Sequence, residues 1–443
     1  MTKHLTLALL TTLSFAALAS AQDVLTLDDA IALGLAHNRT VANAALETNK
    51  ADEDIAIARS HRLPSFKIQA QGSQLLRPVD VTFARGAFGT FAGIGPVPAT
   101  DTNITTPARF SFVFDAQVQQ PLTQLFKINL NVKLTEATRE MDREQLRDTR
   151  LGLVDQIRRV YYAMSQTGSA LDANTQTLAM LHEIDRVVAR KVSQQIALSA
   201  DGLTVQSRIA QAELTELTLR HRLATQKEQL NQLLGRDLRT AFDVEAVPAP
   251  SFEEIDLEVA QARALAERPD VKEARIKVQQ ADIARKIAAT DAIPDVGLVV
   301  SYLSPINIDG APRQIATAAV QAQWEPWDWG RRRRTVASKA VAVTQAHNNL
   351  TDVEQRALVE INSGFRRLQE ARFGLRAARA AQDSARENVR VRTTQYTVEA
   401  ALLTDVLQTQ SSLADSDDQY QQALVSFWTA RADFARARGE ETR

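Results

Sequence analysis

The alternation of apolar and polar side chains in residues 315–325 is the pattern of a strand whose two faces meet different surroundings. Val320 and Ala322 fall on one face, whereas Gln321 falls on the other. Pro326 predicts the end of this strand, because proline has no N–H group to donate to a ladder. A long stretch with helical spacing and no proline follows, so the sequence predicts a strand that leads directly into a very long helix.

The same succession of elements occurs in the first half of the chain. Residues 109–120 alternate, Pro121 ends the alternation, and a second long helical pattern follows. Each of these strands is preceded by another alternating segment, at about 65–79 and at about 295–305. A helix of about 65 residues would span roughly 100 Å, which suits a coiled bundle better than a globular core. We therefore expect two helical hairpins, at about 128–235 with a tip near 196–203 and at about 331–438 with a tip near 397–404.

An internal repeat relates the two halves of the chain. Pro64 and Pro294 stand 230 positions apart at the same point of the pattern, whereas Gly235 and Gly439 stand 204 positions apart. The difference falls between the paired strands, where residues 80–107 are rich in glycine and predict a surface loop. Length variation confined to one loop is what duplication of a structural unit leaves behind. The predicted fold is mainly α with a small β part, in two tandem repeats of helix, strand, strand and long helical hairpin, at 22–235 and 257–443, with a linker at 236–256.

Residues 1–21 have the pattern of a secretory signal peptide. A short polar start with Lys3 and His4 precedes a mostly apolar run, and Ala19-Ser20-Ala21 fits the small-residue rule for cleavage. A first transmembrane helix is the alternative, but the apolar run is short for one. No later stretch has 18 apolar residues, so an exported chain that enters a membrane must enter it as strands.

Composition and charge argue against several classes of function. The formal net charge of -1 argues against a nucleic-acid binder, which usually shows a basic excess. The sequence has no cysteine, which excludes disulfides, thiolate metal sites and cysteine nucleophiles. The six histidines show no ligand spacing, and no catalytic constellation is recognisable. We therefore expect neither an enzyme nor a metal or cofactor site.

The four predicted strands have the length of outer-membrane strands that are tilted by about 45°. Four strands cannot close a barrel, and open strand edges are not tolerated in lipid. The chain is therefore predicted to form oligomers. Two copies would give eight strands, whose interior side chains fill, whereas three copies would give twelve and could leave a lumen.

With these features the chain resembles the TolC-like outer-membrane efflux proteins over nearly the whole mature sequence. The resemblance rests on the repeat, on strands that end in Gln-Gln-Pro-Leu or Glu-Pro-Trp, and on YTVEAALLTDVLQTQ from Tyr396 to Gln410. It implies a homotrimer in the cell outer membrane, with a twelve-stranded β-barrel that continues into the periplasm as a twelve-helix α-barrel. It also implies a passive exit channel for drugs, ions or secreted polypeptides, with a periplasmic adaptor and an inner-membrane pump as partners.

Asp201 and Asp405 at the predicted tips are candidates for a periplasmic gate, because three copies of each carboxylate would surround one axis. The resemblance suggests Tyr396 as a neighbour that hydrogen-bonds toward Asp201. A capping role is the alternative, in which Ser199 and Thr404 cap the return helices and each aspartate lies in a first turn, where its charge is favourable.

Glycine is frequent in the family at the positions of Gln195 and Glu399. The best-known member has arginine at the position of Ala401 and a second aspartate at that of Gln408.

Trp324, Trp327 and Trp329 lie where a predicted membrane strand ends, which fits an interfacial aromatic belt. Packing in a core is an equally weighted alternative. The run 331–334 is four arginines, which could contact lipid headgroups or transported anions, although a solvated helix start is the simpler interpretation. Pro121 and Pro326 mark the corners between strand and helix.

A non-conducting periplasmic coiled-coil adaptor or scaffold is the main alternative function. Adaptors usually carry a membrane anchor and a β-rich binding domain, and the sequence pattern shows neither.

Overall fold

The computed structural model describes residues 24–440, with the exception of 197, 246, 248–253, 309–311 and 399. The predicted signal peptide at 1–21 and part of the predicted linker at 236–256 lie outside the described residues. Within the described part of the chain, no helix is both long and apolar enough to cross a membrane.

The chain folds into two compact units, and neither of them coincides with a predicted repeat. Unit 1 contains the described residues up to Ala44 together with Leu146–Val271 and Glu354–Arg443, and unit 2 contains Ala45–Gln145 and Lys272–Val353. Each unit takes segments from both halves of the sequence, because α3 (Gln124–Ser193) and α7 (Arg331–Thr397) are continuous helices that contribute to both units.

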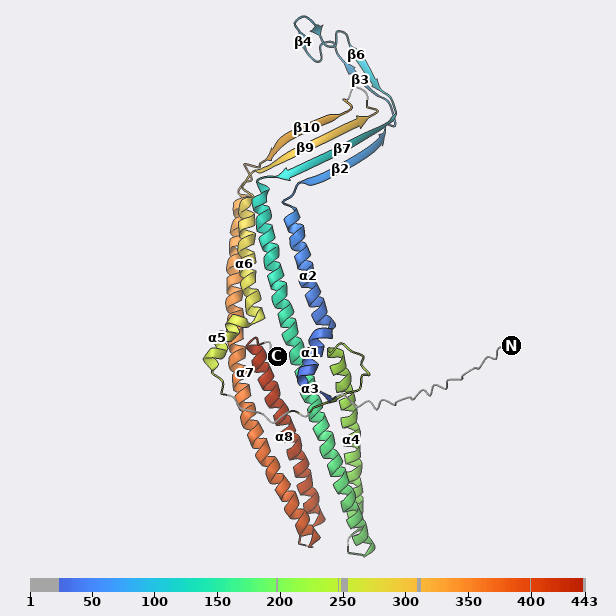
Figure 1. Ribbon diagram of the computed structural model, residues 1–443, viewed down its shortest axis with the longest axis vertical. Coiled ribbons are helices and arrows are strands. Elements are labelled where there is room, and N and C mark those ends of the chain that lie inside the picture. Colours follow the sequence, from blue (N-terminus) through green and yellow to red (C-terminus); the bar gives the residue numbers. More distant parts are fainter. Residues whose placement is uncertain are drawn as a thin grey trace, which may run out of the picture. The chain divides into compact units, whose positions relative to one another are not determined.

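The described residues of unit 2 form an antiparallel four-stranded sheet in the order β10-β9-β7-β2 (Figure 1). The strands are β2 (Ser65–Gln74), β7 (Phe110–Pro121), β9 (Asp295–Ile306) and β10 (Ile315–Gln323). The first strand ends at Gln74, earlier than the predicted 79, and the last ends at Gln323, two residues before the predicted end. The central β7–β9 ladder joins the two halves of the sequence in one sheet.

The register of the sheet separates apolar from polar side chains. Phe66, Val118, Val300 and Ala318 are paired in one row across all four strands. The next row is Lys67, Gln117, Ser301 and Thr317, so the two faces differ in polarity. The Ser301 and Thr317 hydroxyl groups lie 2.7 Å apart on the polar face.

The apolar face is open to solvent in the single chain. Phe66 is 75% exposed, Ile68 is 72% exposed and Val320 is 69% exposed. Within the described residues, β2 and β10 each have a partner on one side only, so both outer edges of the sheet are unpaired.

The predicted surface loop at 80–107 was only partly correct, because it contains short ladders. The strands β3 (Val79–Phe83) and β6 (Thr102–Thr106) pair with each other, as do β4 (Thr90–Phe91) and β5 (Gly95–Pro96). Val79, Val81 and Phe83 alternate with polar residues, but the dense glycines that follow conceal this pattern. Those glycines have positive φ angles and form the turns between the ladders. We call residues 79–106 the arm.

The helices outside the sheet follow the same order in both halves. They are α1 (Leu27–His37), α2 (Arg39–Ser60), α4 (Ser199–Leu233), α5 (Leu257–Glu267), α6 (Pro269–Thr290) and α8 (Leu403–Ala437), in addition to α3 and α7. A short parallel pair of strands, β1 (Val24–Leu25) and β8 (Asp243–Val244), lies in unit 1.

The core of unit 1 follows the helical spacing that the sequence shows. Val154, Ile157, Tyr161 and Met164 are spaced by three, four and three residues, and all four are buried. The Tyr161 hydroxyl donates to the Leu25 carbonyl at 3.0 Å, which ties α3 to β1. A second buried cluster surrounds Ile361, Phe427 and Phe434 of α7 and α8. Each large apolar side chain that is fully buried contributes about 1.5–3 kcal/mol.

Each return helix ends against the break between two shorter helices. The Asn38 side chain lies between α1 and α2, where its Oδ1 accepts from the Thr40 N–H at 2.8 Å and its Nδ2 donates to the Leu233 carbonyl at 2.9 Å. Arg268, between α5 and α6, donates to the Ala437 carbonyl at 3.3 Å. In both halves a side chain between the two shorter helices therefore donates to a carbonyl group near the end of the return helix, but the side chain differs.

Gly235 and Gly439 close these junctions with φ angles of 71° and 70°. A Cβ atom on Gly235 would lie 2.3 Å from the His37 carbonyl oxygen. At Gly439 the shortest such distance is 3.0 Å, to the Arg268 nitrogen. Glycine is required at both positions by the backbone angle and by the close approach of a second chain segment.

We predict that Gly235→Ala lowers the free energy of unfolding of unit 1 by about 2–4 kcal/mol, because the left-handed backbone and the overlap with His37 both cost energy. Gly439→Ala should cost less, because its contacts are less tight. Gly374→Ala is the matched control, because that helical glycine has open space around it and should gain up to about 1 kcal/mol. Denaturant midpoints followed by circular dichroism test the order of the three variants, and a Gly235→Ala midpoint equal to that of the parent would contradict it.

Candidate functional site

The two hairpin tips have the same local structure. After α3 ends at Ser193, Gln195 adopts a φ of 61° and the Ile196 N–H donates to the Lys191 carbonyl at 2.9 Å. The corresponding bond after α7 runs from the Ala400 N–H to the Gln395 carbonyl at 2.8 Å. These bonds satisfy carbonyl groups that the end of a helix leaves free. Gln195 stands where glycine is frequent in the family that the chain resembles, and its left-handed backbone gives the physical reason for glycine there.

Asp201 and Asp405 cap their helices from the third position. The Asp201 Oδ2 accepts from the Leu198 N–H at 3.2 Å, and the Asp405 Oδ2 accepts from the Leu402 N–H at 3.3 Å. Both aspartates are half-buried. Each carboxylate also lies in the first turn, where the helix dipole favours a negative charge.

The predicted caps Ser199 and Thr404 are wrong. The N-cap residues are Leu198 and Leu402, and Ser199 and Thr404 already lie inside the helices. A leucine side chain has no acceptor, so the aspartate three positions on supplies the one side-chain hydrogen bond of each cap. Ser199 and Thr404 were predicted as caps because serine and threonine are more frequent than leucine at the N-cap position.

Tyr396 lies close to the other hairpin of unit 1. The Lys191 Nζ is 4.5 Å from the centre of the Tyr396 ring, which is the geometry of a cation–π interaction. Further along, Leu407 of α8 contacts the cluster of Leu178, Leu181 and Ala212 from α3 and α4. Among the described residues of the single chain, the Tyr396 hydroxyl donates no hydrogen bond to Asp201. In the single chain the Lys191–Tyr396 contact thus links the two tips.

The corner after β10 contains the three predicted tryptophans. Trp324 is 59% exposed, Trp327 is 72% exposed and Trp329 is 91% exposed, so these rings are not core residues in the single chain. The Trp327 and Trp329 rings are perpendicular, with centres 5.9 Å apart. Pro326 lies between β10 and α7 and Pro121 is the last residue of β7, as their predicted corner positions require.

Asp328 organises the start of α7. Its carboxylate accepts from the Gly330 N–H at 3.0 Å and from the Arg332 N–H at 2.9 Å. The hydrogen bond from the Arg332 N–H lowers the pKa of the Asp328 carboxyl below its usual range. Glu325 accepts from Arg331 at 2.5 Å and, through its backbone carbonyl, from Arg332 at 2.6 Å. Two of the four consecutive arginines therefore have acidic partners.

A group of ion pairs that was not predicted from the sequence joins α3 to α8 in unit 1. The Asp155 carboxylate is buried and accepts from Arg159 at 3.0 Å and from Arg436 at 3.3 Å. Arg159 also pairs with Asp433, and burial raises the pKa of the Asp433 carboxyl. Asp155 and Arg436 are far apart in the sequence, so no local pattern could have predicted their contact.

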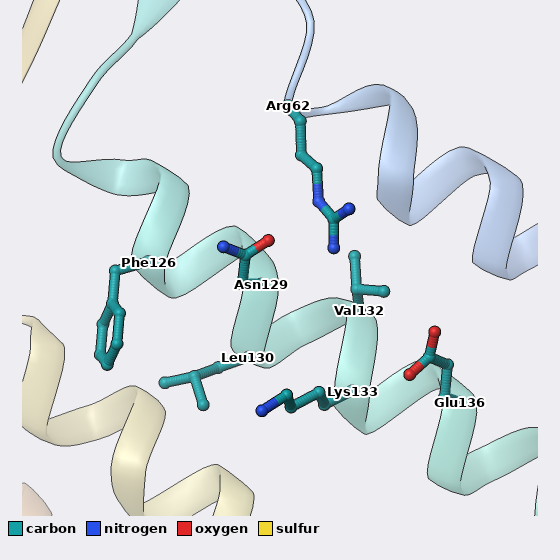
Figure 2. A pocket seen from close by; sticks show the side chains of 7 residues that line it. All are labelled: Arg62, Phe126, Asn129, Leu130, Val132, Lys133 and Glu136. Atoms are coloured by element: carbon teal, nitrogen blue, oxygen red, sulfur yellow. The ribbon is translucent and has the colours of Figure 1, made fainter.

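A groove of about 320 Å³ lies on unit 2 beside the start of α3. Figure 2 shows Arg62 reaching toward α3, which supplies the other lining residues: Phe126, Asn129, Leu130, Val132, Lys133 and Glu136. Glu136 is paired with Arg59 at 2.7 Å. The lining side chains include no nucleophile with an adjacent base, so the groove offers no catalytic arrangement. Among the described residues, no group of three acidic or histidine side chains could hold a metal ion.

Comparison with known proteins identifies the family. Residues 30–236 and 261–440 match the family model of the outer membrane efflux protein. An uncharacterized protein of Haemophilus influenzae is 20% identical over 294 residues, a match that covers 66% of this chain and 60% of the relative's length.

Solved structures share the fold at low sequence identity. A membrane protein from Pseudomonas aeruginosa has a TM-score of 0.77 at 16% identity, with 94% of this chain and 91% of that chain covered. The CmeC outer membrane channel of Campylobacter jejuni has a TM-score of 0.76 at 15% identity, covering 93% and 85%. The outer membrane protein VceC of Vibrio cholerae has a TM-score of 0.74 at 15% identity, covering 93% and 96%. The family match extends over both halves of the sequence, and this chain belongs to the outer membrane efflux protein family.

Proposed function

We propose that three copies of this chain form a passive exit channel of a tripartite export system. The channel would carry drugs, ions or secreted polypeptides across the outer membrane, from an inner-membrane pump and through a periplasmic adaptor. The observation that carries the proposal is the four-stranded sheet, which has an exposed apolar face and an unpaired strand at each edge. In lipid every backbone hydrogen-bonding group needs a partner, so such a sheet must be closed by further copies.

The polarity of the sheet gives the proposed barrel its orientation. The face with Phe66 and Val320 would contact lipid, and the face with Gln117 and Thr317 would line the lumen. Three copies supply twelve strands, which leave a lumen, whereas the interior of an eight-stranded barrel is filled by side chains. Figure 1 shows the sheet and the paired helices that each copy would contribute. In a non-conducting periplasmic adaptor or scaffold, the apolar face of the sheet would be exposed to water, which is unfavourable.

In this proposal the tips form the narrow periplasmic end. Three Asp405 carboxylates would surround the axis, with Asp201 and Tyr396 as neighbours. Both aspartates sit on helix N-termini that the sequence places at equivalent points of the repeat. A ring of like charges favours a bound cation.

The proposed channel requires obligate trimerisation. Native mass spectrometry of the purified protein in detergent should show three chains, because a single sheet leaves two edges open. A stable and monodisperse monomer in detergent and in bilayers would rule out the shared barrel.

A pair of substitutions on one strand tests the orientation of the sheet. Val320→Arg places a charge on the apolar face and should destabilise the inserted protein by about 2–4 kcal/mol if the residue lies near the middle of the bilayer. Gln321→Arg, one position along, should leave the yield of inserted trimer unchanged because that side chain would face the lumen. Heat-modifiable migration of trimers extracted from outer-membrane fractions measures both, and equal losses would contradict the assigned faces.

Asp405→Asn removes the proposed charge while keeping an oxygen that can accept from the Leu402 N–H. We expect weaker cation selectivity and weaker block by divalent ions in planar bilayers, with an unchanged yield of trimer. Asp415→Asn, an exposed aspartate further along α8, is the matched control for the loss of one charge. If the Asp405→Asn channel keeps the reversal potential and block of the parent, Asp405 has only its helix-capping role, worth about 0.5 kcal/mol.

A further inference from the structure

The corner between β10 and α7 exposes aromatic and basic side chains together. We call Trp324, Trp327, Trp329, Arg333 and Arg334 the corner patch. The three tryptophan rings are 59% to 91% exposed, and both arginines are exposed. Large aromatic rings rarely stay this exposed on a soluble surface unless they meet a partner.

The acidic residues of the corner are committed to the two arginines outside the patch. Glu325 pairs with Arg331 at 2.5 Å and with Arg332 at 3.3 Å, and Asp328 lies 3.5 Å from Arg332. Among the described residues, Arg333 and Arg334 form no ion pair. The corner patch therefore carries two positive charges without acidic partners.

Two further carboxylates line a pocket of about 170 Å³ together with Arg331 and Arg332. These are Asp291 and Asp295, and Asp291 is neutralised by Lys127 at 2.6 Å. The acidic side chains thus lie beside Arg331 and Arg332. Arg333 and Arg334 are therefore free to bind an external anion.

The adjoining strand specifies which kind of anion fits. Val320, Ala322 and Trp324 are alternate residues, so the apolar face of β10 runs directly into the corner patch. A free phosphate would bind the arginines and make no contact with this apolar face. A phospholipid would use both, because its acyl chains can cover the apolar strand while its phosphate meets the guanidinium groups. Tryptophan favours the same boundary between apolar and polar surroundings.

We propose that the corner patch binds the headgroup of an anionic phospholipid, one per chain. This inference rests on the proposed function, which puts β10 in a bilayer. The equivalent corner of the first half, after Pro121, has Leu122 and Phe126 but no tryptophan, and its Lys127 is already paired with Asp291. The two corners of one chain therefore differ, and the patch selects lipid at the second corner only.

The tryptophans themselves allow a direct test. The chain has four tryptophans, three of which belong to the corner patch. The fourth, Trp428, is in unit 1, where its Nε1 has no hydrogen-bond partner among the described residues, so Trp428→Phe sacrifices no hydrogen bond. Full-length trimer with this substitution is reconstituted in phosphatidylcholine vesicles. Brominated phosphatidylglycerol or brominated phosphatidylcholine is then titrated in over the same range of mole fractions. Bromine quenches tryptophan fluorescence only at short range.

We expect brominated phosphatidylglycerol to half-quench the fluorescence at roughly tenfold lower mole fraction than brominated phosphatidylcholine, because each arginine near an anionic lipid strengthens binding several-fold. Arg333→Gln combined with Arg334→Gln should abolish this preference. Arg366→Gln combined with Arg379→Gln, two exposed arginines on the same helix, should retain it and controls for the loss of charge.

Three results would overturn the inference, and they have different meanings. Equal quenching by both lipids would show that the corner contacts the bilayer without selecting a headgroup. The proposed channel function would not be contradicted by that result. A preference that 10 mM inorganic phosphate abolishes at constant ionic strength shows a site for free phosphate and not for lipid. Quenching by neither lipid, although the trimer is inserted and conducts, shows that the corner lies outside the bilayer boundary. Failure of the proposed function itself is recognised separately, by the absence of trimers and of conductance.

Discussion

The unpaired edges of the four-stranded sheet are the constraint on which the rest of the structure depends. The described chain supplies a partner for each inner strand and leaves β2 and β10 open. It also leaves a row of apolar side chains in solvent. A water-soluble monomer would have to hide both features, whereas in the proposed trimer lipid would cover the apolar face and neighbouring copies would pair with the open edges.

The two halves of the chain are held together by contacts between segments that are far apart in the sequence. The β7–β9 ladder, the ion pair between Asp155 and Arg436, and the Lys191–Tyr396 contact each join the first half to the second. At both junctions the segment closest to the glycine belongs to the same half, His37 at Gly235 and Arg268 at Gly439. The second junction also has a contact from the first half, because Arg147 of α3 donates to the Gly439 carbonyl at 3.1 Å. Contacts between the halves give the two hairpins different neighbours.

Sequence alone predicted the strands and the long helices because their patterns are periodic over many residues. Pro121 and Pro326 marked the strand ends because proline acts on its own backbone. The ladders of the arm were missed because clustered glycines conceal a five-residue alternation. The cap residues were misplaced because the N-cap residues are Leu198 and Leu402, which have no side-chain acceptor, and the side-chain hydrogen bond comes from the aspartate three positions on, which accepts from the N-cap N–H. The partners of Asp155 and the contact between Lys191 and Tyr396 could not be predicted, since they depend on how separate helices meet.

The charged residues of the four sheet strands limit where this chain can change in length. Lys67, Asp115 and Asp295 all lie on the polar face, because the side-chain period of a strand is two. Insertion of one residue into a strand would carry the charges beyond it to the apolar face, where nothing compensates for them. The arm lies outside the four-stranded sheet, so it can lengthen or shorten without moving any side chain from one face to the other. An epitope or affinity tag placed between Gly89 and Gly93 would accordingly leave the sheet register untouched.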